Sequence, residues 1–173
     1  YYRSEYNLRI EGDRFTYRFY PGLQIDVKNA RIYGGPENQK KFLTADYVHI
    51  FAPLSFLWSS DRVIDKLQVE NTRADLDNPP HIKSQSNQSK GSFQVNEIEV
   101  TGGRATFQKY QVEELHLKSS LKKDRLQIYE LTARSRGSEL KASGSIESFE
   151  KLQYDLNFTF NGDASFAQDV SAN

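Results

Sequence analysis

The residues that could do chemistry in this chain are few and scattered. Cysteine is absent, which excludes disulfides, thiolate metal sites and thiol catalysis together. The three histidines, His49, His81 and His116, share no metal-ligand spacing, and no serine lies in a nucleophile-elbow pattern. We therefore expect solvated surface histidines, no catalytic residue, no metal site, no cofactor and no enzymatic activity.

Two other features have plain structural explanations. Gly102 and Gly103 lie between predicted strands and not before a helix, so they indicate a β-bulge and not a phosphate-binding loop. Acidic pairs such as Glu97 with Glu99 are typical of the polar face of a strand. A two-carboxylate catalytic site would need long-range convergence, and nothing in the sequence indicates it.

Three arginines, Arg31, Arg73 and Arg104, take the same place in a motif that recurs three times. The motif reads Val-x-Asn/Gly-x-Arg-apolar, in the copies Val27–Ile32, Val69–Ala74 and Val100–Ala105. The arginines could line one edge of a sheet and contact lipid headgroups. We favour the alternative, in which they pair with cross-strand acids such as Asp26 or Glu99 on a polar face.

The third position of each motif copy is Asn or Gly, the residue types that most readily adopt positive φ. At a fixed place in a strand pattern, such a residue marks a bulge or bend that shifts the side-chain phase. The motif therefore predicts one β-unit used repeatedly, and it favours an extended sheet over a sealed catalytic pocket.

Alternating apolar residues elsewhere predict about ten to twelve short strands joined by short polar turns, which pair antiparallel. Residues 53–59 differ, because Leu54, Leu57 and Trp58 follow helical spacing after Pro53 and predict a helix of about two turns. Residues 77–92 are almost free of apolar side chains, and we expect a mobile polar loop there. The predicted fold class is mainly β, a curved antiparallel meander with one or two short helices.

Length and charge limit the alternatives further. The 173 residues predict a single domain over 1–173, and a net charge of zero argues against a nucleic-acid partner. No apolar run reaches the roughly 18 residues of a membrane span. The chain begins with Tyr and contains no Met, so we take it to be a fragment from which an upstream anchor or signal could have been removed.

The order of these segments resembles the AsmA-like family, in its TamB type (translocation and assembly module subunit). In the first half, the resemblance rests on Pro21–Val27, Leu43–Tyr47, Leu54–Trp58 and Lys66–Leu76. In the second half, it rests on Ile98–Phe107, Leu126–Ala133 and Leu140–Ile146. The sequence departs from the family pattern at Thr72, where many members have proline.

The resemblance implies a protein of the bacterial envelope that extends through the periplasm and is attached to the inner membrane by an N-terminal helix. It implies a sheet bent into an open, taco-like groove with an apolar interior. Members of the family are implicated in carrying phospholipids between the two membranes and in assembling outer-membrane proteins. The chain would then be the membrane-proximal, N-terminal portion, with phospholipid acyl chains as its ligand.

The predicted groove lining consists of aliphatic and aromatic residues on strands: Ile25, Val27, Ile50, Leu67, Val69, Ile98, Val100, Leu117, Ile128, Leu156, Phe158 and Phe160. Such a lining would contact acyl chains without binding any one lipid tightly, since each buried CH₂ contributes roughly 0.8 kcal/mol. The same residues could instead pack on one another in a closed sandwich core. The predicted helix is expected to cap one end of the groove with Leu54, Phe56, Leu57 and Trp58.

A second function class stays open, that of a protein-interaction scaffold. In it, exposed sheet edges pair with strands of a client or of an outer-membrane assembly protein. A continuous apolar face with nothing filling it would favour lipid, whereas a packed interior with a long unprotected edge strand would favour protein.

Overall fold

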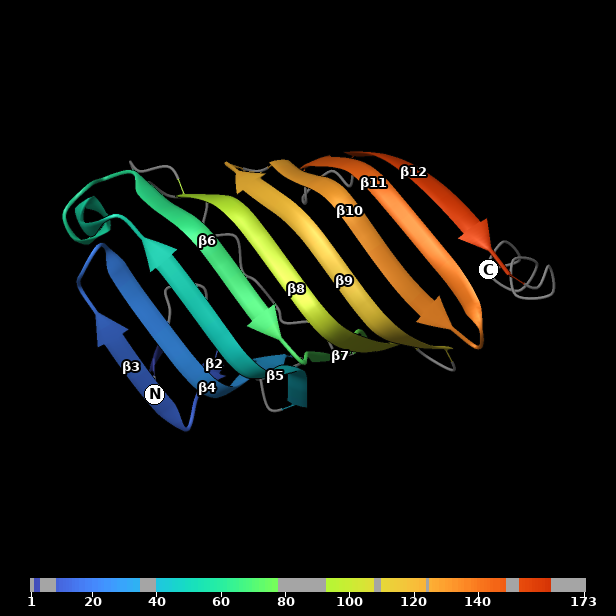
Figure 1. The fold of residues 1–173 in the computed structure, drawn as a ribbon, viewed down its shortest axis with the longest axis horizontal. Helices are drawn as coiled ribbons and strands as arrows, with labels where there is room; N and C mark the ends of the chain where they lie inside the picture. Colours follow the sequence, from blue (N-terminus) through green and yellow to red (C-terminus); the bar gives the residue numbers. More distant parts are fainter. Residues whose placement is uncertain are drawn as a thin grey trace.

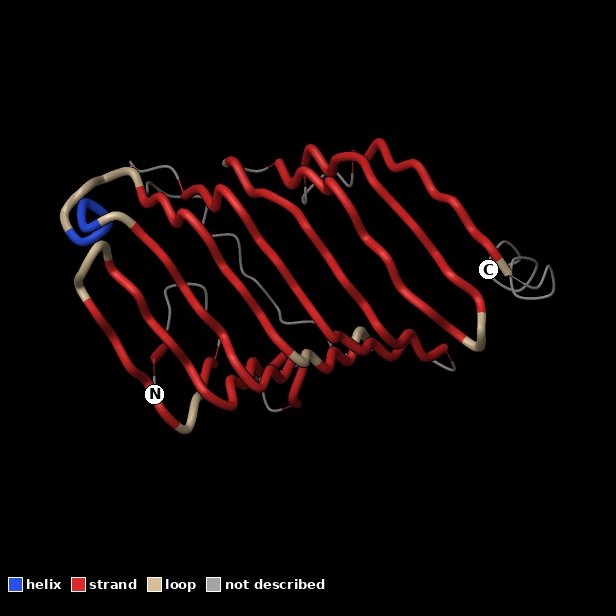
Figure 2. The backbone as a smooth tube through the Cα atoms, viewed as in Figure 1, coloured by secondary structure: helices blue, strands red, loops and turns tan. Residues whose placement is uncertain are grey.

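A single large sheet makes up nearly all of the computed structural model of this chain (Figure 1). The structure describes residues 2–3, 9–34, 40–77, 93–107, 110–123, 125–148 and 153–162. Within this part, the sheet is a broad, twisted ribbon whose strands run side by side from the N-terminal strands at one edge to β12 at the other (Figures 1 and 2).

The strands follow one another along the sheet in nearly the order of the sequence. They are β1 (Tyr2–Arg3), β2 (Arg9–Glu11), β3 (Arg14–Arg18), β4 (Leu23–Gly34), β5 (Lys40–Ala52), β6 (Arg62–Glu70), β7 (Arg73–Asp75), β8 (Phe93–Phe107), β9 (Tyr110–Lys122), β10 (Arg125–Ser135), β11 (Ser138–Ser148) and β12 (Gln153–Asn161). The main path is β1-β2-β4-β5-β6-β8-β9-β10-β11-β12, while β3 pairs with β4, and β7 pairs with β5 and β8. The predicted mainly-β, curved meander is confirmed.

One part of the pairing differs from the prediction of a purely antiparallel sheet. β8 pairs in parallel with β6 and with the short β7, whereas every other pair among the described strands is antiparallel. Parallel pairing requires the chain to return to the starting end of the sheet before the next strand begins. That return lies between β7 and β8, where residues 78–92 of the loop predicted at 77–92 lie outside the described residues.

The motif that recurs three times produces a bend at the same position of each copy, within β4, between β6 and β7, and within β8. Asn29, Asn71 and Gly102 all have positive φ, at 52°, 52° and 66°, as the sequence predicts. The bend shifts the side-chain alternation, so that Val27 and Ala30, three positions apart, are both buried. Each copy thus keeps its apolar residues on one face of the sheet while the strand changes direction.

The helix predicted at 53–59 is shorter than expected. A single 3-10 turn, η2 (Leu54–Leu57), connects β5 to β6, with a hydrogen bond from Phe56 N to Pro53 O at 2.9 Å. No residue of this turn is buried. Helical spacing alone predicts two turns, but a helix this short needs a surface to pack on.

The most deeply buried part of the sheet is small. A cluster of Val27, Ala30 and Ala45 on β4 and β5 is surrounded by partly buried apolar neighbours, namely Ile25, Leu43, Val48 and Val69. All strands described belong to one sheet, so the described residues contain no second sheet of the kind a sandwich core requires.

Candidate functional site

The strand register sorts the side chains of the central strands onto two chemically different faces. Residues directly opposite each other on paired strands point to the same face of a sheet. Following these pairs from strand to strand therefore traces rows that cross the sheet. Two such rows are almost entirely apolar, and we call the surface that they form the apolar face.

Row 1 begins at Tyr17 on β3 and crosses to β12 through Ile25, Ile50, Leu67, Ile98, Ser119, Ile128, Gly144 and Leu156. Row 2 begins at Phe15 and crosses through Val27, Val48, Val69, Val100, Leu117, Leu131, Ala142 and Phe158. Neither row contains a charged side chain.

The predicted lining residues lie together on this face. All of them except Phe160 belong to row 1 or row 2, and Phe160 lies two residues beyond Phe158 on the same strand, opposite Leu140. The prediction omitted Val48, Leu131 and Ala142 from row 2, and it also omitted Phe15 and Tyr17, which begin the two rows on β3. Val48 lies two residues before the predicted Ile50, and Leu131 follows Ile128 by the three-residue step of the motif, so both had a signal in the sequence.

Burial varies systematically along the rows. Val27 and Ile128 are buried within the sheet, and most of their apolar neighbours are half-buried. At the two ends of row 2, Phe15 is 50% exposed and Phe158 is 61% exposed. Row 2 therefore ends in a large, exposed aromatic side chain on both β3 and β12.

Two positions in row 1 lack an apolar side chain. Ser119 is buried between Ile98 and Ile128, and its hydroxyl has no hydrogen-bond partner. Gly144, with φ at 141°, lies so close to β12 that an added Cβ would collide with the carbonyl oxygen of Asp155. Row 1 therefore presents less apolar surface at these two points, and Gly144 allows β11 and β12 to lie close together.

The opposite face, which we call the polar face, carries the charges. Lys66 forms ion pairs with Glu97 at 2.8 Å and with Glu99 at 2.9 Å. These hydrogen bonds raise the pKa of Lys66 above its ordinary value, and the hydrogen bonds from Lys66 and Gln68 lower the pKa of Glu99. The polar face is thus a network of exposed charge pairs, which is typical of a surface in contact with water.

The histidines on strands lie where the alternation predicts, on the polar face. The ring of His49 contacts Asp26 through Nδ1 at 2.7 Å, and its Nε2 lies 4.0 Å from Glu70. His116 is exposed and lies opposite Thr132. His81 falls outside the described residues.

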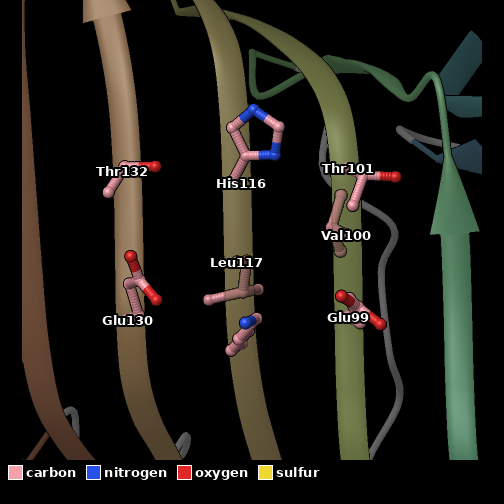
Figure 3. A pocket seen from close by; sticks show the side chains of 8 residues that line it. Glu99, Val100, Thr101, His116, Leu117, Glu130 and Thr132 are labelled. Carbon is pink, nitrogen blue, oxygen red and sulfur yellow. The ribbon is translucent and has the colours of Figure 1, made fainter.

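A shallow depression of about 380 Å³ lies on the polar face over β8, β9 and β10 (Figure 3). Its rim includes Glu99 and Glu130, which face each other across β9 (Figure 3). Lys118 is the register partner of both carboxylates, and Glu99 also pairs with Lys66, so each carboxylate has a cation on a neighbouring strand. We assign it no chemistry.

The three motif arginines have different surroundings. Arg31 bonds to Asp13 at 2.6 Å, whereas Asp26 pairs with Arg18 and His49, and Glu99 pairs with Lys66. Arg31 therefore pairs with a nearby acid, as predicted, but the acid is Asp13 and not Asp26 or Glu99. Arg73 and Arg104 form no ion pair with any carboxylate that the structure describes.

The residues predicted to cap a groove lie at the end of the sheet where β5 turns into β6. Leu54 is 37% exposed, Leu57 50% and Trp58 72%. Phe56 is half-buried under the guanidinium of Arg62, whose carbon lies 5.3 Å from the ring centroid. Leu54, Leu57 and Trp58 are therefore largely exposed at this end of the sheet, and Phe56 alone among the four packs against a strand residue.

Within the described ranges, no group of three or more His, Cys, Asp or Glu side chains is placed to hold a metal ion. None of the helical segments described is long and apolar enough to cross a membrane.

Comparison with known proteins adds no relative: no family model matches the chain, and no curated protein matches it.

Proposed function

We propose that the apolar face binds the acyl chains of phospholipids, as one segment of an AsmA-like protein of the TamB type that conducts lipids between the inner and outer membranes. The observation that carries the proposal is the unbroken absence of charge along rows 1 and 2, from β3 to β12. Exposed protein surfaces of this size are normally polar. A charge-free face on a single-layered sheet therefore supports a role in binding an apolar ligand.

The rows also have the chemistry that a conducting surface requires. Their side chains are mostly aliphatic, so acyl chains would gain contacts of roughly 0.8 kcal/mol per buried CH₂ wherever they lie. Because successive strands present similar residues, no single position would hold a chain much more tightly than its neighbour. Headgroups would remain in water at the margin of the face.

The cellular setting of this proposal follows from the family resemblance. The protein would lie in the periplasm, attached to the bacterial inner membrane through a segment upstream of this chain. No catalysis and no cofactor are involved.

The test is native mass spectrometry of the purified chain, with extraction of bound lipid and cross-linking to a photoactivatable phospholipid. We expect near-stoichiometric phospholipid on the unmodified chain and a loss of cross-linking of at least tenfold in Val100→Asp, which puts a charge in row 2. Thr132→Asp, which puts the same charge on the polar face beside Lys141, is the matched control and should cross-link normally. An unmodified chain that stays free of lipid after incubation with phospholipid would refute the proposal.

A second candidate function is supported by β12. Among the described strands, β12 pairs only with β11, so no described strand lies along its other edge. Tyr154 and Phe158 on this strand are 68% and 61% exposed. In this alternative, β12 adds a strand of a client or outer-membrane assembly protein to the sheet.

A proline substitution in β12 separates the two functions. Asn157→Pro removes a backbone donor from the edge strand and should abolish strand pairing while leaving rows 1 and 2 of β4 to β9 intact. Loss of partner capture with lipid binding retained supports the second function, and partner capture that persists in this variant contradicts it.

A further inference from the structure

The second and third copies of the recurring motif place two arginines side by side on the polar face. Arg73 on β7 and Arg104 on β8 are register partners in the parallel pair. Both side chains are exposed, and neither forms an ion pair within the described structure. Like charges directly opposite each other destabilise a sheet, so this arrangement carries a cost unless an anion offsets it.

The first copy shows how such an arginine is satisfied. Asn29, the residue at the bend, donates a hydrogen bond to one carboxylate oxygen of Asp13 at 2.8 Å. Arg31, two residues later, donates to the other oxygen at 2.6 Å. These bonds lower the pKa of Asp13. In the first copy, the anion is thus supplied by the chain itself, from the turn between β2 and β3.

The row that contains these arginines continues without interruption. Arg31 is the register partner of Thr44, Thr44 of Arg73, and Arg73 of Arg104. The carboxylate of Asp13 reaches only the first of them. The other two arginines occupy equivalent positions in their motif copies and have no such carboxylate.

A depression of about 430 Å³ lies over the two unpaired arginines. Lys41 from β5 adds a third cation to its rim, and the hydroxyls of Thr44 and Thr106 and the amide of Gln111 add neutral hydrogen-bonding groups. Asp75 is the one carboxylate among the residues that line this depression. Three cations with one acid leave an excess of positive charge in a chain whose net charge is zero.

We propose that Arg73, Arg104 and Lys41 form a binding site for a phosphate group. Guanidinium groups bind phosphate oxygens in pairs, and an ammonium group adds a point charge. A phosphate monoester or diphosphate matches this excess of positive charge better than a single carboxylate does. The group can belong to a lipid headgroup or to a soluble phosphate compound. The site lies on the polar face and does not depend on acyl-chain binding by the apolar face.

The experiment uses the purified chain at low ionic strength with two probes. Isothermal titration with pyrophosphate measures binding of the free group, and flotation with phosphatidylcholine vesicles, with and without about one-fifth phosphatidic acid, measures binding of a headgroup. We expect saturable binding of at least one probe, with affinity at least tenfold lower in the double variant Arg73→Gln/Arg104→Gln. Preference for pyrophosphate indicates a soluble ligand, and preference for phosphatidic acid indicates a lipid.

The control removes the same charge elsewhere. Lys122→Gln/Lys123→Gln takes away two exposed cations at the end of β9 and should change the affinity by less than twofold. If both double variants weakened phosphate binding equally, the binding would depend only on the overall charge of the chain, and the proposed site would be wrong. Binding that persists in Arg73→Gln/Arg104→Gln, or no binding of either probe to the unmodified chain, would also overturn it.

A third variant tests the comparison with Asp13 directly. Thr44→Glu places a carboxylate in the row between Arg31 and Arg73. It should reduce phosphate binding at least tenfold while the melting temperature stays the same or rises, because the added carboxylate supplies the missing anion. Unchanged phosphate binding in a folded Thr44→Glu chain would contradict the proposal.

Discussion

The two faces of this sheet are made by the same strands, but their side chains make different kinds of interaction. On the polar face, charges such as Lys66 and Glu99 are held by specific partners at defined distances. On the apolar face, rows 1 and 2 contain no charged group, and the buried hydroxyl of Ser119 has no hydrogen-bond partner. Under the functions proposed above, the polar face would distinguish between ligands, whereas the apolar face would accept any chain of CH₂ groups.

The largest expected effect comes from placing the same charge on each face in turn, at two adjacent residues. Leu131→Asp puts a charge into row 2 and should lower the free energy of unfolding by about 3 kcal/mol, because the carboxylate is desolvated among apolar neighbours. Thr132→Asp puts it on the polar face opposite Lys141, and the cost should stay under about 0.5 kcal/mol. Urea denaturation of both variants measures the difference, and equal costs would mean that the faces are not distinct.

The next effect concerns the bends that keep each face continuous. Gly102→Val places a β-branched residue at a φ of 66° and should cost about 1–2 kcal/mol. Gly102→Asn installs the residue that the other two copies use at this position, so it should cost less than Gly102→Val. Thermal unfolding compares the two variants. A valine that is tolerated as well as asparagine would show that the bend does not require a left-handed residue.

Salt should act on the two faces in opposite directions. Raising NaCl from about 0.05 M to about 0.5 M shortens the screening length and should weaken pyrophosphate binding severalfold. Acyl-chain binding should be unchanged or slightly stronger, because burial of apolar surface is not screened. Parallel titrations with pyrophosphate and with a fluorescent fatty acid would test this, and a parallel decline of both would contradict it.

The smallest effect is a pH dependence confined to the polar face. Because the pKa of Asp13 is lowered in the folded chain, its contribution to stability is present above the unfolded pKa and is lost as the pH falls through the folded value. We expect Asp13→Asn to make the melting temperature less sensitive to acid below about pH 4. Acyl-chain binding should not change with Asp13→Asn, and an equal acid sensitivity in both chains would rule out this contribution.

The sequence predicted the apolar face well because two local rules determine it. Period-two alternation places Val69 and Leu67 on one face, and a left-handed Asn or Gly restores the phase after each bend. Both rules can be applied without knowing which strands pair.

The phosphate site could not be found in the same way. Whether Arg31, Arg73 or Arg104 has a partner depends on which acid the fold brings to it, and Asp13 reaches Arg31 only through the pairing of β3 with β4. The parallel pairing of β6 with β8 is equally nonlocal. The helix at 53–59 was overestimated because side-chain spacing does not show whether a packing surface exists.

The parallel ladder between β6 and β8 has a consequence for how the chain reaches this structure. On either side of it, strands pair with near neighbours in sequence, so β2 to β6 and β8 to β12 can each assemble through short loop closures. Joining β6 to β8 requires closing a longer loop, with a larger entropic cost before any contact is gained. We expect two meanders to form early and the ladder to close last, so that each row becomes continuous across the molecule only in the final step of folding.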